Sequence, residues 1–179
     1  TSTKEMIASI LEQRWPGAVL KTDGNTNNHF GAPRNLLRLS SQHQAAVLEL
    51  GTSHPGEIAM LASMVVPYVG VVSNIGPAHL EFFGDLEGVV REKGCLLAGT
   101  ASDGVAVYTG EAAYADQLRA LAGTRRGRWL PRTGGGLGAR TDAGRAVPGA
   151  ARRGRAAGQR GAAPGAPPGR PWTCAPPAG

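Results

Sequence analysis

Short apolar runs alternate with segments of helical periodicity through residues 1–121, and this alternation is the feature that most constrains the fold. Strands buried on both faces are continuous apolar runs, and parallel neighbours need a crossover of helix length between them. We therefore predict an α/β fold with a mostly parallel sheet and crossover helices. The runs expected to form strands are residues 18–21, 45–50, 68–72 and 105–108.

Helix signals fill the spaces around these strands. The first helix is expected to end at Pro16 and to bury one face, formed by Met6, Ile7, Ile10 and Leu11. Because the predicted order begins with a helix, the strand that should precede that helix is absent from this sequence. Further helices are expected around residues 36–39, from Pro55, after Asp85 as N-cap, and over residues 112–121.

The composition changes after Thr124. Residues 1–124 contain 8 basic and 12 acidic side chains, whereas residues 125–179 contain 11 basic and 1 acidic side chain, so the tail carries the net charge of +6. Gly, Ala, Arg and Pro dominate the tail, which offers too little apolar surface to offset the entropy of ordering. We therefore predict one domain over residues 1–124 and disorder over residues 125–179.

Three origins of the tail stay open. The amino acids missing from it are mainly those with AT-rich codons, which fits a GC-rich gene read out of frame after about Arg126. A natural low-complexity linker and a nucleic-acid-binding tail are the alternatives. Trp129 and Trp172 are too few aromatic residues for a base-stacking platform, and the preceding domain is mildly acidic. Nucleic acid is therefore not an expected partner.

No apolar run approaches the roughly 20 residues of a membrane helix, and the first residues lack the layout of a signal peptide. We therefore expect a cytoplasmic location and no membrane partner.

Polar loops follow three of the expected strands. The first, residues 23–33, contains Asn25, Asn27 and Asn28 among glycines. Because the carboxyl ends of parallel strands meet at one edge of a sheet, where such folds bind ligands, these amides are candidate substrate contacts. The alternative is a long turn, since Asn and Gly are also turn formers.

Glu49 and His79 are candidate metal ligands at the same edge. Glu49 ends a buried run, where a carboxylate is costly unless it is paired or binds a cation. His79 lies in the loop of residues 73–84, together with Asn74, and could ligate a divalent ion through a ring nitrogen. The alternatives are a Glu49 carboxylate that reaches solvent and a structural His79.

Lys93 falls on the apolar stripe of a predicted helix. Partial desolvation favours a neutral amine, which can react with carbon dioxide to give an anionic carbamate. That carbamate would be a further oxygen ligand for magnesium. The alternative is a lysine stem that lies on the apolar surface with its ammonium in water.

Together these motifs resemble the central domain of the Mur ligases, over about residues 1–123. The Asn25 to Pro33 pattern is similar to the branch that joins D-alanyl-D-alanine to a UDP-linked muramoyl tripeptide (UDP-MurNAc-tripeptide). The resemblance implies an incomplete P-loop-like α/β domain of an ATP-dependent amide ligase in peptidoglycan synthesis, which works through an acyl phosphate and acts as a monomer. The other matching motifs are Thr1–Met6, Glu49–Gly51, Pro55–Ile58, Asn74–Gly84 and Lys93–Gly94.

The resemblance also implies roles for single residues, with ATP and Mg²⁺ as cofactors. Glu49, His79 and carbamoylated Lys93 would form the catalytic set. In full, magnesium would be held by Thr1, Glu49, His79 and Lys93, ATP contacted by Thr1, Ser2 and Asn74, and the peptide substrate contacted by Asn25, Asn27 and Asn28.

Several positions depart from the family pattern. The phosphate-loop Gly-Lys would precede Thr1, Cys95 stands where the family usually has Glu, and the turn after Val107 differs. The flanking domains of the family have no counterpart in this sequence, so we expect a fragment that does not turn over ATP alone. The alternatives are another ligase of the superfamily, such as a muramoyl-tripeptide or folylpolyglutamate synthetase, and a nucleic-acid binder that uses its basic tail.

Overall fold

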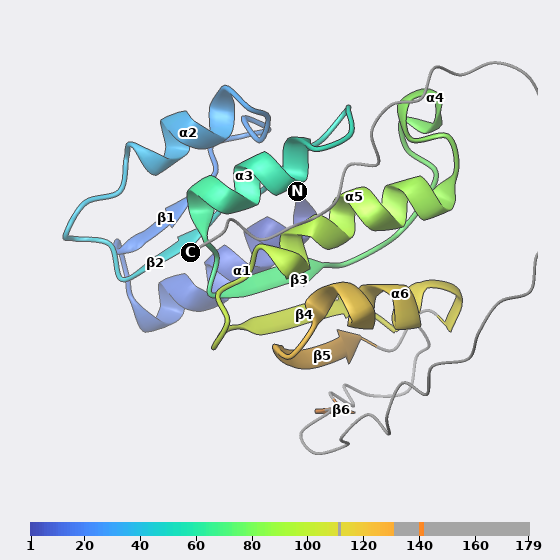
Figure 1. The fold of residues 1–179 in the computed structure, drawn as a ribbon. Coiled ribbons are helices and arrows are strands. Elements are labelled where there is room, and N and C mark those ends of the chain that lie inside the picture. Colours follow the sequence, from blue (N-terminus) through green and yellow to red (C-terminus); the bar gives the residue numbers. More distant parts are fainter. Residues whose placement is uncertain (111, 131–139, 142–179) are drawn as a thin grey trace, which may run out of the picture.

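The computed structural model describes residues 1–110, 112–130 and 140–141. Helices and strands alternate along most of this part of the chain (Figure 1), and the predicted α/β fold with parallel strands is confirmed. The elements are α1 (Ser2–Arg14), β1 (Val19–Lys21), α2 (Gly31–Leu36), β2 (Ala45–Val47), α3 (Glu57–Val65), β3 (Val69–Val72), α4 (Leu80–Phe83), α5 (Leu86–Ala98), β4 (Val105–Thr109), α6 (Ala112–Ala122), β5 (Arg126–Leu130) and β6 (Arg140–Thr141).

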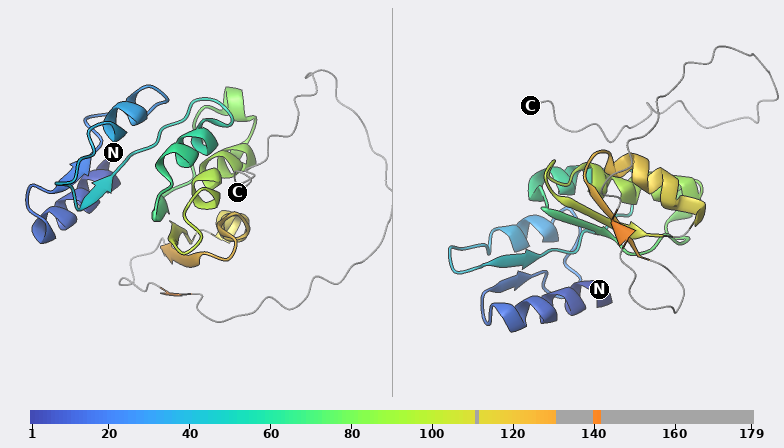
Figure 2. Two further views of the ribbon diagram at one scale, coloured as in Figure 1. Left: turned by 60° about the vertical axis from the view of Figure 1, so that its left-hand side comes forward. Right: turned by 90° about the horizontal axis from the view of Figure 1, so that it is seen from below.

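The strands form two sheets, whereas a single sheet was expected from the pattern of apolar runs. β1 and β2 pair in parallel, and β3, β4 and β5 form a second parallel ladder to which β6 adds in the antiparallel direction. β2 ends at Val47, because the Glu49 N–H donates to the Thr22 side chain instead of continuing a ladder. Figure 2 shows the part from α1 to β2 beside the larger part from α3 to β5.

The main hydrophobic cluster lies in the larger part, where α5 and α6 pack on β3 and β4. Helix α5 begins as predicted: Asp85 Oδ1 accepts a hydrogen bond from Gly88 N at 2.7 Å. Gly94 lets α6 approach closely, since a Cβ there would lie 2.3 Å from Leu121 Cδ1. The buried cluster consists of Val72, Ile75, Phe83, Val89, Val90, Leu97, Ala106, Tyr108, Leu118 and Ala122.

The predicted buried face of α1 is wrong for two of its four residues, whereas Ile7 and Leu11 are partly buried. Met6 and Ile10 are 66% and 65% exposed, whereas Lys4 and Ala8 are buried. Lys4 can be buried because its ammonium donates to the backbone carbonyl groups of Thr22 and Gly24 at 3.0 and 2.9 Å. A pattern that places apolar residues inside misses a lysine whose charge is solvated by the backbone.

Two other helix boundaries differ from prediction. Helix α3 begins at Glu57, not at Pro55, after Gly56 in the left-handed conformation at φ 89°. Helix α2 ends at Leu36, so Leu37 and Leu39 lie beyond it and are exposed. None of the helices in the described part of the chain is long and apolar enough to cross a membrane.

The folded part extends beyond the boundary predicted at Thr124. Strand β5 pairs with β4 along its whole length, from Arg126 to Leu130. The Arg125 guanidinium also donates to the carbonyl groups of Ala98 and Thr100, at 2.6 and 2.5 Å. Disorder predicted from residue 125 is therefore wrong for residues 125–130, because backbone pairing and an arginine clamp replace apolar burial. The rest of the predicted tail includes β6. Its other residues, 131–139 and 142–179, lie outside the described residues.

Candidate functional site

Glu49 is the centre of a small polar group just after β2. Its Oε1 accepts hydrogen bonds from Asn27 Nδ2 at 3.0 Å and from Thr1 Oγ1 at 3.2 Å. Its Oε2 is buried and, within the described residues, accepts no hydrogen bond, although the Lys4 ammonium lies 3.9 Å away. A buried carboxylate oxygen without a donor is costly, and hard oxygen ligands are those that Mg²⁺ prefers. The carboxylate and the Thr1 hydroxyl therefore fit a magnesium ion.

The loop between β1 and α2 is held in shape by its own amide side chains. Asn28 Oδ1 accepts from the backbone N–H groups of Phe30 and Gly31, at 3.1 and 2.9 Å, where α2 begins. The Asn27 carbonyl accepts from Gly51 N at 2.8 Å. A Cβ at Gly51 would lie 2.7 Å from Asn27 Oδ1, so this close approach requires glycine.

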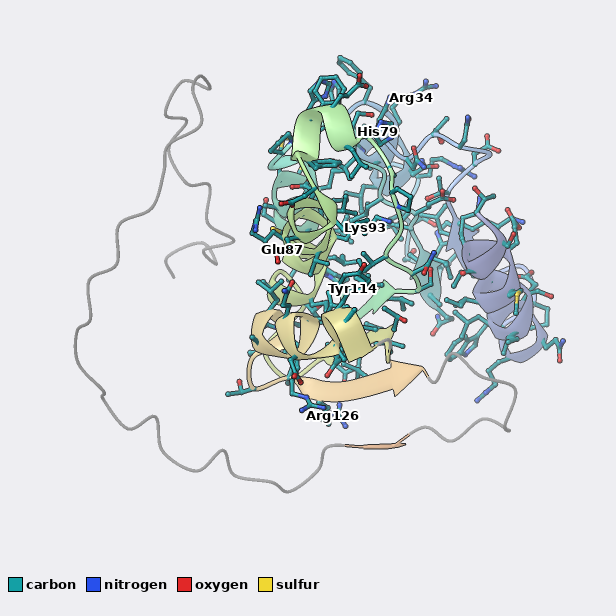
Figure 3. All side chains as sticks on the ribbon, turned by 90° about the vertical axis from the view of Figure 1, so that its right-hand side faces the viewer. Arg34, His79, Glu87, Lys93, Tyr114 and Arg126 are labelled. Carbon is teal, nitrogen blue, oxygen red and sulfur yellow. The ribbon has the colours of Figure 1, made fainter. Side chains whose placement is uncertain are left out.

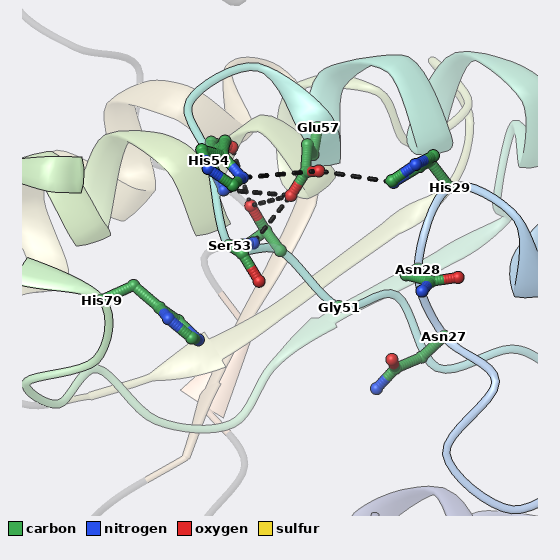
Figure 4. Close-up of a pocket in the computed structure, with 9 residues that line it drawn as sticks. Asn27, Asn28, His29, Gly51, Ser53, His54, Glu57 and His79 are labelled. Carbon is green, nitrogen blue, oxygen red and sulfur yellow. Dashed lines mark hydrogen bonds and ion pairs between the residues drawn. The ribbon is translucent and has the colours of Figure 1, made fainter.

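A cavity of about 330 Å³ opens beside this loop (Figure 4). Its walls come from three loops and the first turn of α3. Figure 4 shows His79 on the side opposite Asn27 and Asn28. His79 has a left-handed backbone at φ 51°, a strained conformation for a residue other than glycine. The lining residues are Asn27, Asn28, His29, Gly51, Thr52, Ser53, His54, Glu57 and His79.

Glu57 is the carboxylate of this cavity. Its Oε2 accepts from the backbone N–H groups of Ser53 and His54, at 2.7 and 3.0 Å. Its Oε1 lies 3.5 Å from His29 Nδ1 and 4.0 Å from His54 Nδ1. Partial burial opposes ionisation, but the donors from Ser53 and His54 outweigh it and hold the pKa of Glu57 below its ordinary value of 4.5.

Lys93 lies on α5 (Figure 3) and is not among the residues that line the cavity. Its Nζ donates to the backbone carbonyl of Asn74 at 3.3 Å. Burial lowers the pKa of Lys93 from its ordinary value of 10.5, because desolvation penalises the charged amine. This shift is in the direction that carbamate formation requires.

Comparison with known proteins decides the family. A family model described as the Mur ligase middle domain matches residues 1–130. The chain belongs to the Mur ligase family. It is 46% identical over 118 residues to the UDP-N-acetylmuramoyl-tripeptide--D-alanyl-D-alanine ligase of Haemophilus influenzae, a match that covers 65% of this chain and 26% of that protein. The chain thus spans about a quarter of the length of this relative.

Solved structures of ligases also resemble this Mur ligase domain. One is the UDP-N-acetylmuramoylalanyl-D-glutamyl-2,6-diaminopimelate--D-alanyl-D-alanyl ligase of Acinetobacter baumannii, with a TM-score of 0.65 and 38% identity over 71% of this chain and 27% of that one. Another is the MurF ligase of Thermotoga maritima in complex with ADP, with a TM-score of 0.62 and 30% identity over 75% of this chain and 31% of that one.

In this Mur ligase domain the predicted site residues fall into groups, and Asn27 joins two of them, because it donates to Glu49 and also lines the cavity. Glu49 joins Thr1 and Asn27, with the exposed Ser2 next in the chain. Asn28 and His79 line the cavity, whereas Lys93 contacts Asn74, and the exposed Asn25 lies outside the lining. Within the described ranges, three or more His, Cys, Asp or Glu side chains nowhere gather as a metal site. The predicted roles of these residues therefore stay predictions.

Glu92 also shapes the site, although it was not expected from the sequence to do so. It is fully buried on α5, and it accepts from Ile58 N and Gly56 N, both at 2.8 Å. Its Oε1 also lies 3.0 Å from Thr52 Oγ1. Glu92 therefore holds the loop that leads into α3, and with it one wall of the cavity.

Lys4 was also missed. Its ammonium fixes the start of the Asn-rich loop and lies 3.9 Å from Glu49 Oε2 and 2.9 Å from Glu5 Oε1. The one sequence signal for it is its helical spacing from Ala8 and Leu11 on the side of α1 that packs against the sheet.

Proposed function

We propose that this chain carries the metal-binding and substrate-binding part of an ATP-dependent amide ligase. The reaction joins D-alanyl-D-alanine to a UDP-linked muramoyl tripeptide, as the name of the Haemophilus relative states for that protein. The observation that carries the proposal is the buried Oε2 of Glu49, which accepts no hydrogen bond within the described residues, on a carboxylate whose Oε1 accepts from the Thr1 hydroxyl. We also infer a cytoplasmic location, because a UDP-linked substrate is made from a cytoplasmic nucleotide.

Glu49 Oε2 and Thr1 Oγ1 are the groups that would hold magnesium. Asn27 donates to the other Glu49 oxygen and so fixes the orientation of the carboxylate. The first N–H groups of α1 lie next to Thr1, where a helix N-terminus favours phosphate oxygens. When bound, MgATP supplies the phosphoryl group that activates the substrate carboxylate as an acyl phosphate.

The remaining polar residues would position the peptide and a second ion. Asn28 uses Oδ1 to cap α2, which leaves its Nδ2 as a donor toward the cavity. His79 presents an imidazole from the opposite wall. Lys93, whose pKa is lowered, would supply the carbamate. These groups bind and orient, and the rate gain comes from proximity and from neutralised charge.

A chimera tests this function. Residues 1–130 replace the matching segment of the Haemophilus ligase, and amide formation is measured with ATP, UDP-MurNAc-tripeptide and D-alanyl-D-alanine. We expect product that depends on all three, and a loss of about 100-fold in kcat for Glu49→Gln, by analogy with the removal of one charge-stabilising group. Glu87→Gln, an exposed carboxylate on α5, is the matched control and keeps its rate.

Two results would contradict the proposal. One is a chimera that unfolds cooperatively, like the parent ligase, but forms no product. The other is full activity in Glu49→Gln.

A further inference from the structure

The two oxygens of Glu57 have different surroundings. Oε2 accepts two backbone hydrogen bonds, from Ser53 and His54, that fix the turn before α3. In the described part of the chain, Oε1 accepts no hydrogen bond, and its near neighbours are imidazole nitrogens at 3.5 and 4.0 Å. In Figure 4 the dashed lines run from Glu57 to His29 on one side and to His54 and Ser53 on the other. One oxygen is structural, and the other keeps its acceptor capacity for a ligand.

The charge of the cavity is set by this carboxylate. Partial burial opposes ionisation, but the backbone donors outweigh it and keep the pKa of Glu57 below its ordinary value of 4.5, so the carboxylate is ionised at neutral pH. Glu92, the nearby buried carboxylate, is directed instead to the N-terminus of α3. Asn27 turns its Nδ2 toward Glu49, so its Oδ1 remains as a second acceptor. A cavity with an anionic oxygen and an amide acceptor favours a cation with several N–H donors.

We propose that this cavity binds a primary ammonium group of the peptide substrates, with Glu57 Oε1 as its counter-ion. The choice of a peptide rests on the proposed function. At about 330 Å³ the cavity suits one aminoalkyl or aminoacyl group, and not a whole nucleotide-linked peptide. Two sources have this chemistry: the amino terminus of D-alanyl-D-alanine, and a side-chain amine at the third peptide position, such as the diaminopimelate named for the Acinetobacter ligase.

Glu57→Gln isolates the ligand-facing oxygen. The glutamine Oε1 takes over the acceptor role toward Ser53 N and His54 N, and its Nε2 takes the position of the glutamate oxygen that faces the cavity. The turn before α3 keeps its hydrogen bonds, whereas the negative charge is lost. Glu87→Gln makes the same chemical change at a side chain that is 66% exposed, on another helix.

The experiment uses the 179-residue chain and two matched pairs of peptides. The first pair is D-alanyl-D-alanine and its N-acetyl form. The second is N-acetyl-L-Ala-γ-D-Glu-L-Lys and the same peptide with norleucine in place of lysine. Binding is followed by amide chemical shifts in ¹⁵N-labelled protein. We expect the ammonium member of one pair to bind about tenfold more tightly than its neutral partner, with shifts at His54 and Asn28, because a hydrogen bond to a charged group is worth about this factor or more.

The variants then test whether Glu57 causes the preference for the ammonium peptide. Glu57→Gln is expected to reduce the preference below about twofold without weakening the neutral peptide, and Glu87→Gln to keep it. A preference in the first pair identifies the dipeptide amine, and one in the second pair identifies the third-residue amine.

Three outcomes overturn the proposal: no preference in the unaltered chain, an unchanged preference in Glu57→Gln, or shifts confined to residues outside the cavity. The first comparison uses unaltered protein, so it decides the matter even where a variant unfolds. Ligation by the chimera together with no ammonium preference would refute this site alone and leave the ligase function standing.

Discussion

Glu92→Gln is predicted to destabilise the fold through the start of α3. The native carboxylate accepts from Ile58 N on one oxygen and from Gly56 N on the other, both at 2.8 Å. Glutamine has only one acceptor oxygen. If that oxygen keeps the Ile58 bond, the amide NH₂ faces the Gly56 N–H, and a buried donor is left unpaired.

The magnitude follows from these contacts. An unpaired buried N–H costs about 1–3 kcal/mol, and loss of the buried charge at the N-terminus of α3 adds about 0.3–2 kcal/mol. A neutral side chain also recovers part of the desolvation cost of a buried carboxylate, which acts in the opposite direction. We therefore expect the free energy of unfolding to fall by about 2 kcal/mol, a large share of the roughly 5–15 kcal/mol of a typical domain.

Urea unfolding of the 179-residue chain, followed by far-ultraviolet circular dichroism, measures this change. The control is Glu87→Gln on the same helix, which is exposed and should stay within about 0.5 kcal/mol of the unaltered chain. If Glu92→Gln and Glu87→Gln unfold at the same urea concentration with the same slope, the hydrogen bonds of Glu92 do not stabilise the start of α3 and the reasoning is refuted.

Three further predictions concern other residues. Asp85→Ala removes the side chain that accepts from Gly88 N at the start of α5 and should lower the free energy of unfolding by about 1 kcal/mol. Asp85→Asn retains an acceptor oxygen and should lose much less stability. Equal losses in both variants would argue against capping. Lys21 and Lys4 lower the pKa of Glu5 to about 2, so the stability from its ionised form is complete above the unfolded value of 4.5 and is lost as pH falls toward 2. As the pH falls over this range, the melting temperature of Glu5→Gln should therefore decrease less steeply than that of the unaltered chain. The same pH dependence in both proteins would contradict the ion pairs. Finally, ¹³C-bicarbonate should give a carbamate signal by ¹³C NMR that is absent from Lys93→Arg, and a signal that persists in this variant would exclude Lys93 as its source.

Local signals predicted most of the fold. The four apolar runs became β1 to β4, and Asp85 capped α5, because strand hydrophobicity and capping depend on neighbours in the sequence. The buried side of α1 could not be predicted this way. Lys4 is inside because the carbonyl groups of Thr22 and Gly24, in the loop after β1, accept its hydrogen bonds.

The candidate site was predictable only in part, for the same physical reason. Glu49 was recognisable because a carboxylate at the end of a buried apolar run needs a partner, whatever fold the rest of the chain adopts. Glu92 was not, since its partners Ile58 and Gly56 lie 34 and 36 residues earlier. The position of Glu57 in a motif was visible, but the unequal surroundings of its two oxygens depend on a turn that only the folded chain shows.

The uneven distribution of apolar burial has a consequence for how the cavity responds to a ligand. The main hydrophobic cluster runs from Val72 to Ala122, whereas few apolar side chains are buried between α1 and β2. Backbone amides of α1 to β2 should therefore exchange with deuterated solvent through local opening, before those of α5 and β4. Asn27 belongs to the part from α1 to β2, and His79 belongs to the larger part. A molecule that contacts both residues would therefore slow amide exchange throughout α1 and β1, far beyond the residues it touches.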